Sequence, residues 1–438
     1  MEENEYKLTV CGCGPAGVSP LIYMEEYDLL EPLLKEGVCL IDKSNSVGSG
    51  NIKNYKITAN SLGKVFTEIF TNPQSPLLKY LTDKESCKEL SHFKDDPPNL
   101  PLVGKLMDDI GDYLSEKIKS FAQSKVLLNT TVTQIHTRLD GRYDIVFNYG
   151  DSKDSSAKLT TEHLLFNLGG LQEFPPFISQ KTASSGHVWL SSDFIMGKWD
   201  HDLLSLLQRS TNTLNIAVIG ASHSAFSILY RLKNHFNLIP GSQIDVNILH
   251  KSPLRLFYNS IEEASQAGYH FDCKTDVCSH SGRVNRFSGL RYDSFQLARD
   301  VLDGKYNNVR LSPVSKSGRS DEHEYINRAD IIIVSTGYKK NRVQIFDKDG
   351  SLLSLAMDSN GVITNNYCNP ILQNGRALQN FYTYGLGAGQ RVNAENGGET
   401  SYTGRIDGIW FYQHEVTKRI VPIITSKVKQ LLESKRRR

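Results

Sequence analysis

A glycine-rich turn after a short apolar strand occurs twice, and this feature restricts the fold more than any other. The first copy spans residues 8–17, with the sequence LTVCGCGPAG, and the second spans residues 214–225, with the sequence LNIAVIGASHSA. In each copy a strand of buried type leads into small residues and then into a helix. This order is typical of the nucleotide-binding units of doubly wound α/β folds. The sequence therefore predicts an α/β protein with two Rossmann-like dinucleotide-binding domains.

The first turn has the complete Gly-x-Gly-x-x-Gly pattern. Gly12 permits the tight turn, Gly14 lets a pyrophosphate approach the helix N-terminus, and Gly17 allows helix and strand to pack closely. The next strand, residues 37–41, ends in Asp42, where a carboxylate would accept hydrogen bonds from the ribose of FAD or NAD. The alternative is a structural turn with a surface aspartate. The predicted nucleotide contacts are Gly12, Gly14, Pro15, Ala16, Gly17, Asp42 and Lys43.

The second turn, at Gly220, is followed by a strand that ends in basic residues. Lys251 and Arg255 come soon after the strand at residues 245–249, and no acidic residue stands at the end of this strand. Cations at this place would pair with a 2′-phosphate, so the predicted nucleotide is NADPH. The alternative is that both cations are simply solvated. The predicted contacts are Gly220, Ser222, Ser224, Ala225, Lys251 and Arg255, in which the serine hydroxyls supplement the backbone donors.

Charge and composition exclude several classes of protein. The 438 residues include 50 basic and 48 acidic ones, for a formal net charge of +2. This balance argues against nucleic acid or an anionic membrane as partner, and no apolar run approaches the roughly 18 residues of a membrane span. Scattered cysteines and the lack of an apolar leader favour the cytoplasm. The basic residues 435–438 are expected to be a solvated helix end, and the oligomeric state stays open, a homo-oligomer included.

Two further strand ends complete a characteristic order of motifs. Residues 328–338 (RADIIIVSTGY) predict a buried strand that stops at Thr336 and Gly337, and residues 164–170 (LLFNLGG) are its earlier counterpart. A Gly-Leu-Gly sequence follows at residues 385–387. In this order the motifs resemble those of the class B flavoprotein monooxygenases, in particular the N-hydroxylating enzymes that act on ornithine and lysine.

The resemblance implies that an NADPH domain is inserted into an FAD domain. The expected parts are residues 1–210 (FAD domain, first part), 211–340 (NADPH domain) and 341–438 (FAD domain, C-terminal part). NADPH would reduce FAD, and the reduced flavin would react with O₂ to give a hydroperoxide that oxygenates a nitrogen or sulfur of a small molecule. Thr336, Gly337 and Gly387 would lie at the cofactors.

Three more candidates follow from the same resemblance. Residues 54–64 (NYKITANSLGK) occupy the stretch that, in N-hydroxylating members, supplies an amide beside the flavin and a basic residue at the substrate. Asn60 is thus a candidate for the catalytic amide, and Lys64 for holding a substrate carboxylate. Asp407, at an expected helix start, is a candidate flavin contact or only complements the helix dipole. For Asn60 and Lys64 the alternative is a polar loop position without a catalytic role.

Other functions and sites stay open at this point. A flavin-dependent NAD(P)H reductase or dehydrogenase would need the same motifs, and so would a protein that binds FAD without turnover. The pattern His270-x-x-Cys273-x4-Cys278-x-His280 holds candidate zinc ligands and a candidate dithiol. Its spacing fits no standard zinc finger, and the flavin disulfide reductases carry their cysteine pair soon after the first glycine turn. No metal is therefore predicted.

Overall fold

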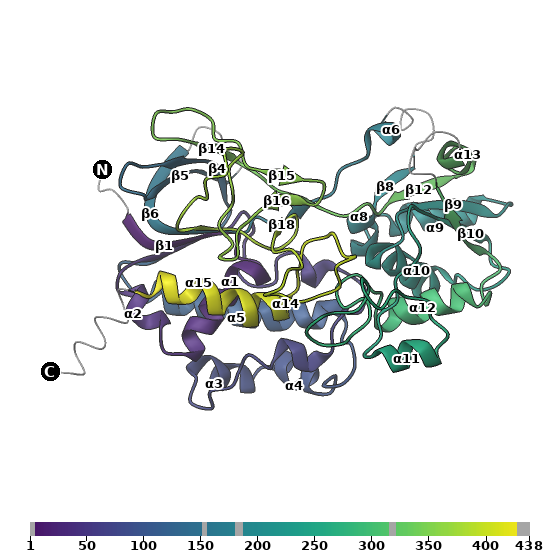
Figure 1. Ribbon diagram of the computed structural model, residues 1–438, viewed down its shortest axis with the longest axis horizontal. Helices are drawn as coiled ribbons and strands as arrows, with labels where there is room; N and C mark the ends of the chain where they lie inside the picture. Colours follow the sequence, from purple (N-terminus) through teal and green to yellow (C-terminus); the bar gives the residue numbers. More distant parts are fainter. Residues whose placement is uncertain (1–4, 151–155, 180–186, 315–320, 427–438) are drawn as a thin grey trace.

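The first glycine turn joins β1 (Glu5–Cys11) to α1 (Pro15–Glu26), and the second joins β9 (Leu214–Ile219) to α10 (His223–Phe236). The computed structural model describes residues 5–150, 156–179, 187–314 and 321–426. It contains two α/β units, one built around β1 and the other around β9 (Figure 1). The basic residues 435–438 lie outside the described residues.

The first sheet combines strands from both ends of the chain. Its strand order is β14-β4-β5-β6-β1-β2-β3, and β17 pairs with β6. β1 runs parallel to β2 and β6, whereas β4, β5 and β6 form an antiparallel meander. Because β14 (Gln344–Phe346) and β17 (Phe381–Tyr382) follow the second unit, that unit is inserted into the first, as predicted. The remaining strands are β2 (Val38–Ile41), β3 (Lys125–Leu127), β4 (Thr130–Thr137), β5 (Tyr143–Tyr149) and β6 (Ser156–Phe166).

The second sheet consists of parallel strands in the order β11-β10-β9-β12-β8. β8 (Val188–Leu190) pairs with β12 (Ile331–Val334), so the second unit includes a strand that lies before the boundary expected at residue 210. Of the polar residues 209–213 that suggested this boundary, Arg209 ends α9 (Asp200–Arg209) and residues 210–213 connect α9 to β9. The other two strands are β10 (Ile244–His250) and β11 (Val309–Pro313).

Helices pack on both sheets. In the first unit, α5 (Leu100–Lys119) and α15 (Thr417–Ile424) contact α1, and Figure 1 shows α15 running beside α1. In the second unit, α10 contacts α12 (Tyr292–Leu302). Among the described helices, none is both long and apolar enough to cross a membrane. Shorter helices are α2 (Leu30–Leu34), η1 (Ile52–Asn54), η2 (Gly63–Phe66), α3 (Pro76–Thr82), α4 (Glu85–Ser91), α6 (Pro176–Ser179), α8 (Ser191–Met196), α11 (Ile261–Gln266), α13 (Asp321–Arg328), α14 (Ile409–Phe411) and the π-helix η3 (Tyr412–Val416).

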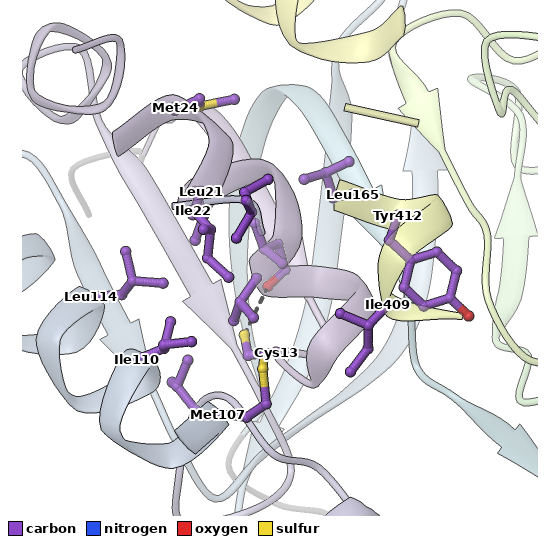
Figure 2. Packing of buried hydrophobic residues seen from close by; sticks show 14 of the residues in the cluster. Cys13, Leu21, Ile22, Met24, Met107, Ile110, Leu114, Leu165, Ile409 and Tyr412 are labelled. Carbon is purple, nitrogen blue, oxygen red and sulfur yellow. Dashed lines mark hydrogen bonds between the residues drawn. The ribbon is translucent and has the colours of Figure 1, made fainter. Parts of the chain in front are cut away.

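The core of the first unit depends on residues that are far apart in the chain. Figure 2 shows Leu21 of α1 and Ile110 of α5 in one cluster with Ile409 and Tyr412 from the C-terminal segment. Leu165, in the central strand β6, belongs to the same cluster and is fully buried. The C-terminal residues therefore complete the hydrophobic core of the N-terminal unit.

Two short strands connect the units. β7 (Gly170–Leu171) lies where the chain leaves the first unit, and β13 (Lys339–Lys340) lies where it returns. The two pair antiparallel, with Lys339 opposite Leu171. Between β13 and the C-terminal helices, β15 (Met357–Asp358), β16 (Gly361–Ile363) and β18 (Ala388–Gly389) form a small sheet of their own.

Leu165→Ala tests whether the shared cluster stabilises the fold. Removing a fully buried leucine side chain costs its transfer free energy plus that of the cavity, so we expect the free energy of unfolding to fall by about 2–5 kcal/mol. Leu139→Ala is the control, because Leu139 is 85% exposed, and a change within about 0.5 kcal/mol is expected there. Urea denaturation followed by circular dichroism measures both. Equal losses in the two variants would contradict this account of the core.

Candidate active site

The first glycine turn has the geometry of a phosphate-binding turn. Gly12 has φ +85°, and a Cβ atom there would lie 2.2 Å from the carbonyl oxygen of Asn167, so no side chain fits. A Cβ atom on Gly14 would have its nearest neighbour 3.7 Å away, on Gly50, which leaves the backbone open to approach. Gly14 is also the N-cap of α1 and provides no side-chain cap, so the first amides of the helix remain available to an anion. Gly17 is buried against the turn, and Pro15 and Ala16 are partly exposed beside it.

Asp42 lies directly beside this turn, at the end of β2. Its Oδ2 accepts a hydrogen bond from the backbone N–H of Cys13 at 2.6 Å. Its Oδ1 accepts from the backbone N–H and the hydroxyl of Ser44, at 2.8 and 2.7 Å. The carboxylate is thereby fixed next to the open helix end, while Lys43 is exposed. Open amides next to a fixed carboxylate are the donors and acceptors that the pyrophosphate and ribose of a dinucleotide need, so these residues fit FAD.

The second glycine turn repeats this geometry. Gly220 has φ +106°, and a Cβ atom there would lie 2.4 Å from the carbonyl oxygen of Ser335. Ser222, the N-cap of α10, makes no side-chain cap bond and is exposed. Nε2 of His223 is buried without a hydrogen-bond partner among the described residues, and burial together with the charge of Arg291 lowers the pKa of His223 to about 4. This helix end therefore has unpaired polar groups that fit the phosphates of NADPH. Of the remaining predicted contacts, Ser224 is partly exposed, Ala225 is buried, and Thr336 and Gly337 are exposed after β12.

The two predicted 2′-phosphate ligands differ in their surroundings. Lys251 is exposed just after β10 and has no ion pair with any residue in the described ranges. Arg255 instead donates to the hydroxyl of Ser401 at 2.7 Å, and its guanidinium lies 3.9 Å from the carboxylate of Asp276. Arg255 thus connects the second unit to the C-terminal segment, which leaves Lys251 as the better placed of the two for a phosphate.

The C-terminal segment brings Gly387 and Asp407 back to the first unit. A Cβ atom on Gly387 would lie 2.1 Å from the backbone nitrogen of Lys340, so this glycine permits close packing on β13. Asp407 is in contact with solvent, yet the surrounding protein desolvates its carboxylate enough to raise its pKa to about 6. It directly precedes the N-cap Gly408 of α14, at the helix start that the sequence predicts.

The loop that carries Asn60 and Lys64 is attached to the second unit. The hydroxyl of Thr58 donates to Asp293 at the start of α12, at 2.6 Å, and Lys56 forms an ion pair with Asp200 at 3.2 Å. Asn60 itself is exposed, and its side chain makes no hydrogen bond to another described residue. The structure therefore places the predicted amide at the junction of the two units.

Lys64 lies in η2 and forms an exposed ion pair with Asp95 at 2.7 Å. Asp95 is the main cause of the raised pKa of Lys64, and the charges of Glu68 and then Tyr292 add to it. Tyr292 begins α12, so Lys64, which is predicted to bind the substrate, lies near the start of this helix. A substrate anion would have to replace Asp95 as the partner of Lys64.

The sequence interpretation missed a second contact between the units. Glu399 is fully buried, and its carboxylate accepts hydrogen bonds from the backbone N–H groups of Phe287 and Ser288 at 2.8–3.2 Å and from the Ser288 hydroxyl at 2.8 Å. Residues 255–291, between β10 and α12, thereby pack on the C-terminal segment. In the sequence, this segment is marked only by three closely spaced arginines, which are Arg283, Arg286 and Arg291.

His280 and Cys278, two residues of the histidine and cysteine pattern in this segment, have other partners in the described structure. Nε2 of His280 lies 2.9 Å from the backbone oxygen of Ala394, and the sulfur of Cys278 accepts from the backbone N–H of Gly398 at 3.2 Å. Within the part of the chain that the structure describes, no group of metal-ligating side chains comes together. Both residues instead hold the segment against the C-terminal residues.

Similarity to a characterised enzyme decides the family. The chain is 32% identical over 430 residues to the CMP-5′-(3-aminopropyl)phosphonate hydroxylase of Streptomyces rubellomurinus, in a match that covers 94% of this chain and 96% of the relative. No family model matches the chain. The chain belongs to the class B flavoprotein monooxygenases. It is a flavin-dependent monooxygenase that hydroxylates a small molecule.

Solved structures of this class have the same fold at low sequence identity. The ornithine N-hydroxylase of Kutzneria sp. 744 matches with a TM-score of 0.56 at 15% identity, over 97% of this chain and 99% of that one. The cadaverine monooxygenase of Erwinia amylovora, bound to FAD, matches with a TM-score of 0.58 at 14% identity, over 96% and 94%. These matches confirm the predicted fold of a monooxygenase with two dinucleotide domains. The residues that bind each cofactor in this monooxygenase stay a prediction.

Asp407→Asn tests the desolvation of this carboxylate. The pKa of Asp407 in the folded state, about 6, lies above the ordinary value for aspartate. As the pH rises from about 4 to 6, this carboxyl therefore ionises in the unfolded chain before it ionises in the folded one, and the flavin-free monooxygenase loses stability. Asparagine carries no charge, so the variant should melt at a higher temperature than the wild type at pH 8 and at nearly the same temperature at pH 4. Differential scanning fluorimetry measures this, with Asp303→Asn as an exposed control. A difference in melting temperature between variant and wild type that is the same at pH 4 and pH 8 would contradict the raised pKa of Asp407.

Proposed function

We propose that this chain is an FAD- and NADPH-dependent monooxygenase that hydroxylates the amine nitrogen of a small molecule carrying a phosphonate or phosphate group. The observation that carries the proposal is the similarity, over nearly the whole chain, to a hydroxylase of CMP-5′-(3-aminopropyl)phosphonate. The named substrate of that relative contains an amine and no sulfur, which favours nitrogen over sulfur. O₂ would be the second substrate, and we expect the enzyme in the cytoplasm.

The first unit would hold FAD. The open backbone at Gly14 and the amides of α1 would bind the pyrophosphate, and Asp42 would accept the ribose hydroxyls. Asp407 would contact polar groups of the flavin. When bound and reduced, FAD supplies the oxygen-transfer chemistry that no amino-acid side chain can provide.

The second unit would hold NADPH. Gly220 and Ser222 leave the N-terminus of α10 open to the phosphates, and Lys251 offers a cation for the 2′-phosphate. Thr336 and Gly337, exposed after the neighbouring strand β12, lie at the same edge of the sheet, because β9 and β12 are parallel. Dinucleotides bind outside the carboxyl ends of the strands in such sheets.

The loop between the units would hold the reacting part of the substrate. Asn60 would provide an amide hydrogen bond at the site of oxygen transfer, and Lys64 would bind an anionic group of the substrate in place of Asp95. The bond between Thr58 and Asp293 keeps this loop against the second unit. Holding the two units together at this point would exclude water from the reacting atoms.

Substrate-coupled turnover is the decisive test. The purified protein, supplied with FAD and NADPH in air, should oxidise NADPH faster when CMP-5′-(3-aminopropyl)phosphonate is added, and mass spectrometry should find a product with one more oxygen atom. A control substrate in which methyl replaces the amine should give no such product. NADPH oxidation without an oxygenated product would favour the reductase, and the absence of NADPH oxidation would favour a protein that only binds FAD.

Lys251→Ala tests the choice of NADPH. Loss of a lysine ammonium that binds a phosphate weakens binding by on the order of 1.5–3 kcal/mol. We therefore expect KM for NADPH to rise about tenfold or more. KM for NADH should change little, because NADH has no 2′-phosphate. Steady-state kinetics with both nucleotides measures the ratio, and Arg310→Ala, an exposed arginine on β11, is the control. An equal effect on the two nucleotides would remove Lys251 from the 2′-phosphate site.

A further inference from the structure

Three arginines in the segment between β10 and α12 have no acidic partner within ion-pair distance among the described residues. Arg283, Arg286 and Arg291 occur within nine positions, and none of them forms an ion pair with a carboxylate in the described residues. Arg255, in the same segment, does lie near a carboxylate, that of Asp276. The three cations are therefore an uncompensated group in an otherwise nearly neutral chain.

Arg286 and Arg291 are partly buried and in contact, whereas Arg283 is exposed. The guanidinium of Arg291 lies 3.7 Å from the ring centroid of Phe257 and donates to the backbone oxygen of Arg286 at 2.5 Å. Burial is the main cause that lowers the pKa of Arg291 to about 10, and the charges of Arg283 and Arg286 act in the same direction. The three side chains are thus close enough to repel one another. Burying like charges without a counter-ion is unfavourable, so such a group gains stability when an anion binds.

The nearby protein anions are already engaged. Glu399, which lies near Arg291, directs its carboxylate to the backbone of Phe287 and Ser288. Asp276 accepts from the hydroxyl of Ser401 at 2.6 Å. Arg286 donates to the sulfur of Cys278 at 3.5 Å rather than to an acid. No described carboxylate is therefore within ion-pair distance of the three guanidinium groups.

The location of the group points to a ligand between the two units. Arg291 lies close enough to His223, at the open end of α10, to lower the pKa of that imidazole, whose Nε2 is buried and unpaired among the described residues. On its other side, Tyr292 lies near Lys64 and Asp293 binds Thr58. The arginines therefore lie between the second glycine turn and the loop that carries Asn60.

We propose that Arg283, Arg286 and Arg291 form a binding site for the phosphonate or phosphate group of the substrate. The inference rests on the proposed function and adds the residues that select the substrate class. Arginine suits this role because its planar set of N–H donors matches the oxygens of a tetrahedral anion with two bonds at once. Three such side chains exceed what a single substrate carboxylate requires, and they would distinguish this enzyme from one that accepts free amino acids.

The double variant Arg283→Gln/Arg286→Gln tests the site and spares the more buried Arg291. Isothermal titration of the FAD-loaded protein with CMP-5′-(3-aminopropyl)phosphonate should give a Kd at least about tenfold higher than that of the wild type. The Kd of NADPH should stay within about twofold. Arg310→Gln is the matched control and should change neither constant. Arg286→Lys, which keeps the charge and loses the paired donors, should have an intermediate effect.

Two results would overturn the proposal. If the Kd of NADPH rises and that of the phosphonate does not, the cations bind a phosphate of the nicotinamide nucleotide. If neither constant changes while the FAD content and melting temperature match those of the wild type, the arginines bind no ligand anion. Because binding is measured without turnover, the result is separate from the hydroxylation assay. A wild type that binds the phosphonate through these arginines but fails to hydroxylate it would contradict only the proposed function.

Discussion

Both units are organised by the same close contact between backbones. The glycines that follow β1 and β9 each lie against the residue that follows a neighbouring parallel strand, Gly12 against Asn167 and Gly220 against Ser335. Each contact is closed by hydrogen bonds, from Gly12 to Ile41 at 2.9 Å and from Asn167 to Cys11 at 2.8 Å in the first unit. The second unit repeats them with the same lengths, from Gly220 to Leu249 and from Ser335 to Ile219. Any side chain at either glycine would separate the strands at the edge that is proposed to bind a dinucleotide.

The rest of the site depends on how these two edges are held together. The loop at residues 54–64 is joined to the second unit through Thr58 and Asp293, and residues 255–291 are joined to the C-terminal segment through Glu399. Both connections are short, buried or partly buried hydrogen bonds to carboxylates, which are stronger than bonds between neutral groups. The junction of the two units thus combines a few hydrogen bonds to carboxylates with apolar contacts, such as those of Tyr55 and Ile57 with the core of the second unit.

Local patterns are sufficient to predict the two glycine turns, and the order of the motifs predicts the insertion through its resemblance to the class B flavoprotein monooxygenases. A glycine turn, its preceding strand and the acid or base after the next strand lie within a few dozen residues, so they are visible in the sequence. The place of β8 in the second unit is not predictable in this way, because a strand of three residues has no periodicity and its partner β12 is far away in the chain. Arg255 has the sequence position of a phosphate ligand because it follows β10, but its contact with Ser401 depends on how the C-terminal segment folds back. The predicted cofactor-binding turns thus depend on local sequence, whereas the proposed substrate site depends on contacts between distant segments.

The pairing of β7 with β13 has a consequence for how the chain is assembled. Because Leu171 and Lys339 lie opposite each other, the second unit begins and ends at neighbouring points. A host domain interrupted in this way keeps its own topology, since a short turn in place of the whole insertion would reconnect it. The unit proposed to bind NADPH and the unit proposed to bind FAD can therefore diverge as separate modules, provided that the paired linker and the contacts at Thr58 and Glu399 are retained.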